Sequence, residues 1–114
     1  MIVNIIETEF YNEIIPEGFI SIETMEEFEK SLSSLINKNK NIIINFKQTD
    51  FIDSSSIGLL IMNLKLVKKK GLKIIFFDLN KSVQETFTII GLINSLIIAK
   101  SHDEAVSLAS TPNN

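Results

Sequence analysis

The chain has 114 residues, of which 45% are hydrophobic and 22% charged, and its formal net charge is −3. This length and composition are typical of one soluble globular domain that buries its own core. The net negative charge disfavours nucleic acid as the main partner, and no apolar run approaches the ~18 residues of a membrane span, so we expect neither nucleic-acid binding nor direct membrane insertion.

The first part of the chain predicts two strands and then a helix. We expect strands at 3–7 and 11–15, and Pro16 breaks the second because proline cannot donate to a strand ladder. Thr24 and Glu27 have the spacing of a capping box, in which each side chain satisfies the backbone amide of the other residue at a helix start. The apolar residues on the helix face expected to pack on a sheet are Met25, Phe28, Leu32, Leu35 and Ile36.

The middle of the chain predicts strand, helix and strand. The β-branched run at 41–47 is apolar on both faces in its middle, which is typical of a central strand. A helix is expected from about Ser55 to Lys70, with Gly71 as its C-terminal signal, and a buried strand follows at 72–77. The helix face expected to contact the sheet comprises Ile57, Leu60, Ile61, Leu64 and Val67.

The last part predicts a helix, a strand and a short helix. Ser82 and Glu85 have capping-box spacing, and Gly91 ends the helix that they open. The side chains of this helix expected to point inward are Val83, Phe87 and Ile90. A strand at 95–99 comes next, and a third capping box, formed by Ser101 and Glu104, precedes the final helix.

The resulting order is β-β-α-β-α-β-α-β-α. Strands that alternate with helices predict an α/β fold with a mixed, mostly parallel sheet and about four helices, and the first two strands can form an antiparallel pair. We expect a single domain over residues 1–110 and a frayed tail over residues 111–114.

The residue types restrict the available chemistry. There is no cysteine, and all eleven basic residues are lysine, so thiolate chemistry and bidentate arginine contacts are absent. His102 is the only histidine and follows a predicted helix cap, where we expect a solvated surface residue. Without a second histidine, neither a zinc cluster nor a serine–histidine triad can be assembled, so we expect no metal, no cofactor and no enzyme. The chain start lacks a secretory signal, which indicates a cytoplasmic protein.

The most informative segment is the run FIDSSSIGLL at 51–60. It lies between a predicted strand and a predicted helix, where ligands and partners meet an open α/β sheet. Helix starts favour anions because their backbone amides are unpaired. Aspartate and serine are also among the best helix caps, so capping alone accounts for Asp53 and the three serines that follow it.

The sequence Asp53-Ser54-Ser55-Ser56-Ile57-Gly58 resembles the D-S-[ST]-G-[LI]-G signature of bacterial anti-sigma factor antagonists, which are STAS-domain proteins. Gly71 before an apolar strand, the segment FTIIGL at 87–92 and the segment EGFI at 17–20 also lie where that family has similar residues. Two positions depart from the family pattern. Ser56 replaces a glycine, and Ser21 replaces an aspartate that commonly belongs to the surface touching the kinase.

This resemblance implies a partner-switching regulator of transcription. The unphosphorylated form would bind an anti-sigma factor that is also a serine kinase and thereby release a sigma factor. The kinase would phosphorylate Ser55, with Ser54 as the alternative acceptor, and a serine phosphatase would reverse the modification. Ser56 adds a third hydroxyl group. The partner-binding residues that we expect are Ser21, Asp53, Ser54, Ser55, Ser56, Ile57, Gly58, Leu59 and Met62.

Other interpretations remain open from the sequence. Leu59, Met62 and Leu66 form a second apolar stripe, which predicts either burial against a neighbouring helix or partner binding. The chain could also be a STAS scaffold or transporter-associated module that never carries phosphate. A receiver phosphorylated on aspartate is disfavoured, because Asp50 and Asp53 have no acidic pair after the first strand to complete a magnesium site. Lys68–Lys70 are interpreted as complementing the helix dipole.

Overall fold

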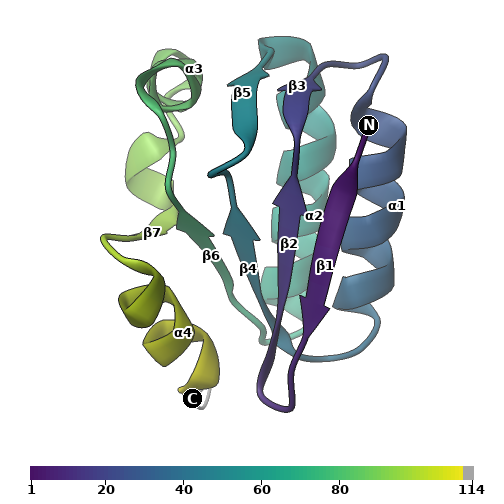
Figure 1. Cartoon of the computed structure of the whole chain (residues 1–114), viewed down its shortest axis with the longest axis vertical. Helices are drawn as coiled ribbons and strands as arrows, with labels where there is room; N and C mark the ends of the chain where they lie inside the picture. The colour runs from purple at the N-terminus through teal and green to yellow at the C-terminus, as the bar shows by residue number, and fades with distance from the viewer. Residues whose placement is uncertain (112–114) are drawn as a thin grey trace.

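A five-stranded sheet forms the centre of the molecule, and the computed structural model describes residues 1–111 (Figure 1). In spatial order its strands are β1 (Val3–Glu7), β2 (Tyr11–Pro16), β4 (Asn41–Asn45), β6 (Ile74–Phe77) and β7 (Ile97–Ala99). β1 and β2 are antiparallel, whereas every other neighbouring pair is parallel. The predicted mixed sheet with an antiparallel N-terminal pair is therefore confirmed. Of the predicted tail at 111–114, only Thr111 lies within the described residues.

Two short strands, β3 (Gly18–Ile20) and β5 (Thr49–Ile52), were not predicted from the sequence. They pair in parallel with each other and continue beyond the ends of β2 and β4 (Figure 1). Gly18 adopts φ +85°, a left-handed conformation that suits glycine, and it turns the chain from β2 into β3. The hydroxyl group of the buried Thr49 donates to the Pro16 carbonyl oxygen at 2.9 Å. This small ladder leads the chain directly to Asp53.

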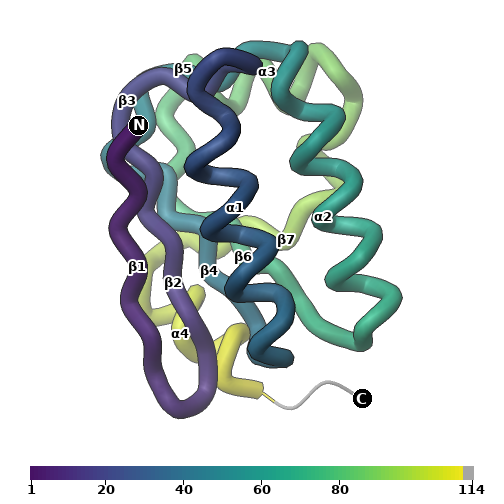
Figure 2. Tube along the Cα trace, turned by 90° about the vertical axis from the view of Figure 1, so that its right-hand side faces the viewer, coloured from purple at the N-terminus to yellow at the C-terminus, as the bar shows by residue number. Residues whose placement is uncertain are grey.

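Four helices are described, and they cover both faces of the sheet: α1 (Met25–Ile36), α2 (Ile57–Lys69), α3 (Lys81–Ile90) and α4 (His102–Ser110). α1 and α2 lie on one face, and α4 lies on the other (Figure 2). α3 contacts β5 near the end of the molecule where the small ladder lies. Within residues 1–111, no helix is both long and apolar enough to cross a membrane.

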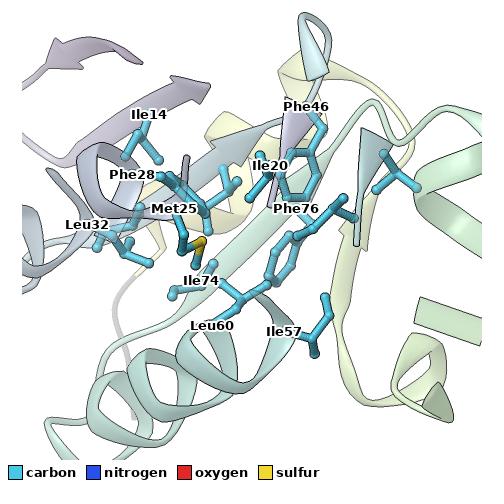
Figure 3. Close-up of a cluster of buried hydrophobic side chains, with 14 of the residues drawn as sticks. Ile14, Ile20, Met25, Phe28, Leu32, Phe46, Ile57, Leu60, Ile74 and Phe76 are labelled. Carbon is cyan, nitrogen blue, oxygen red and sulfur yellow. The ribbon is translucent and has the colours of Figure 1, made fainter. Parts of the chain in front are cut away.

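The main core lies between the sheet and the first two helices (Figure 3). Ile14, Ile44 and Phe76 occupy matching positions on β2, β4 and β6, and all three are fully buried. The apolar face of α1 is buried as its periodicity predicts. Burying each such side chain contributes about 1.5–3 kcal/mol. On the opposite sheet face, a smaller cluster joins Ile43 and Ala99 to Ala105 of α4.

Helix starts follow the predicted caps only in part. The Ser101 hydroxyl oxygen accepts from the Glu104 amide, as expected for the final helix. The Thr24 side chain does not cap α1, because its hydroxyl group accepts from the Ser21 amide and donates to the Phe19 carbonyl oxygen. The cap of α3 is Asn80 rather than Ser82, which lies inside the helix.

Two other expectations about side chains also need correction. Ile90 was expected to point inward but is 36% exposed, because α3 ends there and Gly91 turns the chain in a left-handed conformation. His102 was expected to be solvated surface. Its ring is half exposed, but its Nε2 atom lies 2.8 Å from Oε1 of Glu13, a strand residue that is only 2% exposed. The Asn45 side-chain amide donates to the second Glu13 oxygen at 2.9 Å.

Asn12 is the unusual polar residue of the core. It lies on β2 beside Ile42 and is fully buried, yet neither polar atom of its side chain has a hydrogen-bond partner among the described residues. Burying an unpaired amide is unfavourable by about 1–3 kcal/mol. With no partner among the described residues, the Asn12 amide is expected to lower the stability of the fold.

We expect Asn12→Leu to raise the free energy of unfolding by about 1–2 kcal/mol, because leucine has the same branched shape without polar atoms. Urea denaturation of the two proteins measures this difference. Asn94→Leu, at an exposed position whose side chain makes no hydrogen bond within residues 1–111, is the control and should change stability by less than about 0.5 kcal/mol. A loss of stability in Asn12→Leu would show that the amide has a partner in solution.

We expect His102→Ala to lower the free energy of unfolding by about 1–3 kcal/mol, because it removes a hydrogen-bond partner from the buried Glu13 carboxyl group. Asp103→Ala, at the neighbouring exposed position of α4, is the control. Equal stability of both variants in urea denaturation would contradict a structural role for the Glu13–His102 contact.

Candidate functional site

The candidate site is the turn between β5 and α2. β5 ends at Ile52, residues Ser54–Ser56 form one turn of 3-10 helix, and α2 begins at Ile57. The α-helix therefore starts two residues later than the predicted Ser55. The Asp53 amide donates to the Ile20 carbonyl oxygen at 2.9 Å, which fixes the turn to the end of β3. The site thus depends on both short strands.

Asp53 organises this turn through one carboxylate oxygen. Its Oδ1 atom accepts hydrogen bonds from the Ser55 hydroxyl at 2.8 Å, the Ser56 hydroxyl at 2.9 Å and the Ser56 amide at 3.1 Å. Asp53 therefore caps the 3-10 turn Ser54–Ser56 that leads into α2. The N-cap residue of α2 itself is Ser56, whose side chain makes no cap hydrogen bond. The hydrogen bond from Ser55, supported by those from Ser56, lowers the pKa of the Asp53 carboxyl group below its usual 3.8, and desolvation opposes this effect.

The three serines have different surroundings. Ser54 and Ser55 are exposed, and of these two it is the Ser55 hydroxyl group that donates a hydrogen bond to Asp53. Ser56 is fully buried, and its hydroxyl group donates toward the Asp53 carbonyl and carboxylate oxygens. The side chain that replaces the family's glycine therefore points into the protein and does not cover Ser55.

The predicted partner-binding residues are divided between surface and core. Ser56 and Ile57 are buried, so their side chains do not contribute to the exposed surface. Asp53, Ser21 and Leu59 are partly exposed, and Ser54, Ser55, Gly58 and Met62 are exposed. Met62 is 66% exposed and Leu66 is also exposed, whereas Leu59 packs against the core. The second apolar stripe of α2 is thus only partly used for packing.

An exposed aromatic pair beside this turn was missed in the sequence. Phe19 of β3 and Phe51 of β5 are register partners, and their rings meet edge to face with centroids 5.9 Å apart. Phe19 is 65% exposed. The repeated dipeptide Phe-Ile could have revealed the pair, because Ile20 and Ile52 point inward and strand side chains alternate between faces.

A hollow of about 280 Å³ lies next to Ser54, between β5 and α3. Phe51, Thr86 and Ile89 contribute to its lining, together with Glu85. Within residues 1–111, no three histidine, cysteine, aspartate or glutamate side chains come together as a metal site would require. The turn therefore offers two accessible hydroxyl groups beside apolar and acidic surface.

Comparison with known proteins supports this description. The family model for the STAS domain matches residues 7–105. The fold is similar to that of a candidate anti-sigma factor antagonist from Thermotoga maritima, with a TM-score of 0.84, 21% identity and coverage of 96% of this chain and 95% of that chain.

Two structures of SpoIIAA also have this fold. The unphosphorylated form of this anti-sigma factor antagonist has a TM-score of 0.78 and 20% identity, with coverage of 98% of this chain and 100% of that chain. The phosphorylated form, described as a Bacillus cell fate determinant, has a TM-score of 0.71 and 21% identity, with coverage of 94% and 98%.

We expect Asp53→Ala to lower the free energy of unfolding at pH 7 by about 1 kcal/mol, the usual effect of losing a helix cap. Because the folded-state pKa of Asp53 is lowered, its stabilising effect is present above the usual value and is lost as pH falls from about 4 through the folded-state pKa. The stability difference from the native protein should therefore narrow below pH 4. Asp50→Ala, at an exposed position, is the control. A pH-independent difference would contradict the ionised cap.

Proposed function

Because this chain belongs to the STAS domain family, we propose that it is a cytoplasmic anti-sigma factor antagonist controlled by phosphorylation of a serine in the turn before α2. In its unphosphorylated form it binds an anti-sigma factor that is also a serine kinase, and the sigma factor is released. A serine phosphatase restores the binding form.

The exposure of the Ser55 hydroxyl group is the observation that carries this assignment. Of the three serines, Ser55 is exposed and oriented by Asp53, Ser54 is exposed without a side-chain hydrogen bond among the described residues, and Ser56 is buried. A kinase must reach the oxygen that it modifies. We therefore assign Ser55 as the acceptor, with Ser54 as the alternative.

Phosphate transfer would change the charge of this surface without changing the core. The bond between the β- and γ-phosphates of ATP breaks, a new bond forms from the γ-phosphorus to Ser55 Oγ, ADP leaves, and a base of the kinase accepts the hydroxyl proton. The product carries about −1.5 to −2 charge. Since Ser55 is exposed, the phosphate group requires no repacking of buried side chains.

The phosphate group changes the turn itself, and its desolvation weakens partner binding. The phosphate group lies next to the ionised Asp53, and the hydrogen bond from the Ser55 hydroxyl to that carboxylate no longer exists. In a complex the phosphate must also lose water against the partner surface, which costs several kcal/mol unless a cation is present to compensate. The helix start offsets only ~0.3–1 kcal/mol. A net cost of ~3 kcal/mol weakens binding more than a hundredfold.

The cognate kinase is first identified by a pull-down with native and Ser55→Asp baits. We then expect Ser55→Ala to abolish the transfer of phosphate from radiolabelled ATP by that kinase. Ser34→Ala, an exposed serine of α1, is the control and should accept phosphate normally. Loss of transfer only in Ser54→Ala would move the acceptor to Ser54. Transfer to both variants would contradict the assigned acceptors.

Binding measurements with the same kinase separate switching from passive binding. Ser55→Asp should bind at least tenfold more weakly than native protein. Equal binding would replace the proposed switch with a STAS scaffold or transporter-associated module that never carries phosphate.

A further inference from the structure

A second hollow lies beside the C-terminal half of α2, far along the helix from the Asp53 turn. Its volume is about 350 Å³. Ile74 and Phe76 of β6 line it on the sheet side, and Leu64 and Val67 line it on the α2 side. The rest of the lining consists of Lys68, Leu72, Lys73, Ser95, Leu96 and Ile97. Its position places it outside the partner surface proposed above.

The polar side chains of this hollow are all hydrogen-bond donors. They are Lys68, Lys73 and Ser95, and no carboxylate of the described residues lines the hollow. Within residues 1–111, neither lysine ammonium group has an ion pair or hydrogen bond, and the Ser95 hydroxyl group has none either. Two positive charges are therefore unpaired at the edge of an apolar surface, in a chain whose net charge is −3.

Three other hollows, lined by described residues, do not have this character. Glu85 lines the hollow beside Ser54, Asp78 lines one near β7, and Glu9 lines one near α4. The positive charge of the α2 hollow therefore favours an anionic ligand, and its apolar lining favours a ligand that also carries a hydrocarbon group. A volume of about 350 Å³ is at the small end of ligand sites, which suits one short chain and not a two-chain lipid.

From this lining we propose that the hollow binds a free fatty acid of medium chain length. The carboxylate group pairs with Lys68 and Lys73, and the Ser95 hydroxyl group donates a further hydrogen bond. The hydrocarbon chain lies against Leu64 and Leu96. This binding is independent of phosphorylation at Ser55.

NMR titration of the whole protein with octanoate, decanoate and dodecanoate, each kept below its micelle concentration, tests the site. We expect saturable methyl shifts at Leu64, Val67 and Leu96. Each methylene group that the hollow accommodates should tighten binding about threefold to fourfold. Decanol and decyltrimethylammonium should bind at least fivefold more weakly than decanoate, because they lack the anionic group.

Charge variants identify the residues that hold the carboxylate. Lys68→Gln combined with Lys73→Gln should weaken decanoate binding about fivefold or more and leave decanol binding unchanged. The matched control is Lys65→Gln combined with Lys69→Gln. Both of these lysines lie in α2, as Lys68 does, but outside the lining of the hollow. Ser95→Phe should weaken all three fatty acids by filling the hollow.

Several results would overturn this assignment. One is that decanoate and decyltrimethylammonium bind with equal affinity, and another is that the methyl shifts do not saturate. A third is that the two double lysine variants lose decanoate affinity equally. Binding only to phosphatidylglycerol vesicles would identify a membrane contact instead, and concentration-dependent self-association through these residues would identify a contact between copies. We expect Ser55→Ala to bind decanoate with the same affinity as the native protein. Fatty-acid binding can then be judged whatever the outcome of the phosphorylation experiments.

Discussion

The hydrogen bonds to the Asp53 carboxylate determine the shape of the segment that joins the sheet to α2. One oxygen accepts from two serine hydroxyl groups and one backbone amide, while the Asp53 amide is fixed to β3. With Ser56 drawn inward and satisfied, the segment leaves Ser54 and Ser55 on the surface. The contacts that cap the 3-10 turn Ser54–Ser56 therefore also determine which serine hydroxyl groups are exposed.

The small β3–β5 ladder explains why this segment can be both exposed and ordered. β3 supplies the carbonyl group that holds Asp53, and β5 delivers the chain to it. Phe19 and Phe51 place apolar surface next to the exposed hydroxyl groups, and aromatic side chains are favourable contacts in protein interfaces. A change of charge at Ser55 would therefore act on exposed apolar surface and leave the buried core unchanged.

The sequence predicted the α/β fold because its long apolar periods are strong, as in the buried face of α1. From one local motif it predicted the capping role of Asp53 and placed three serines on the binding surface, but Ser56 is buried and only Ser54 and Ser55 are exposed. β3 and β5 were missed because three or four residues carry too little periodicity. Ser82 matched capping-box spacing, but Asn80, two residues earlier, is the cap in the structure. The contact of His102 with Glu13 spans 89 positions, so no local pattern could reveal it.

The covering of one sheet face by α4 has a consequence for the order of events during translation. Residues 1–99 contain all the strands found within residues 1–111, but Ile43 and Ile75 on that face meet Ala105 and Ala109 of α4. The Glu13 carboxyl group also gains its contact with the His102 ring only when α4 is in place. This face is therefore buried only after the residues up to Ala109 have been synthesised. Until then, a nascent chain that has formed its sheet exposes isoleucine side chains to chaperones and to other chains.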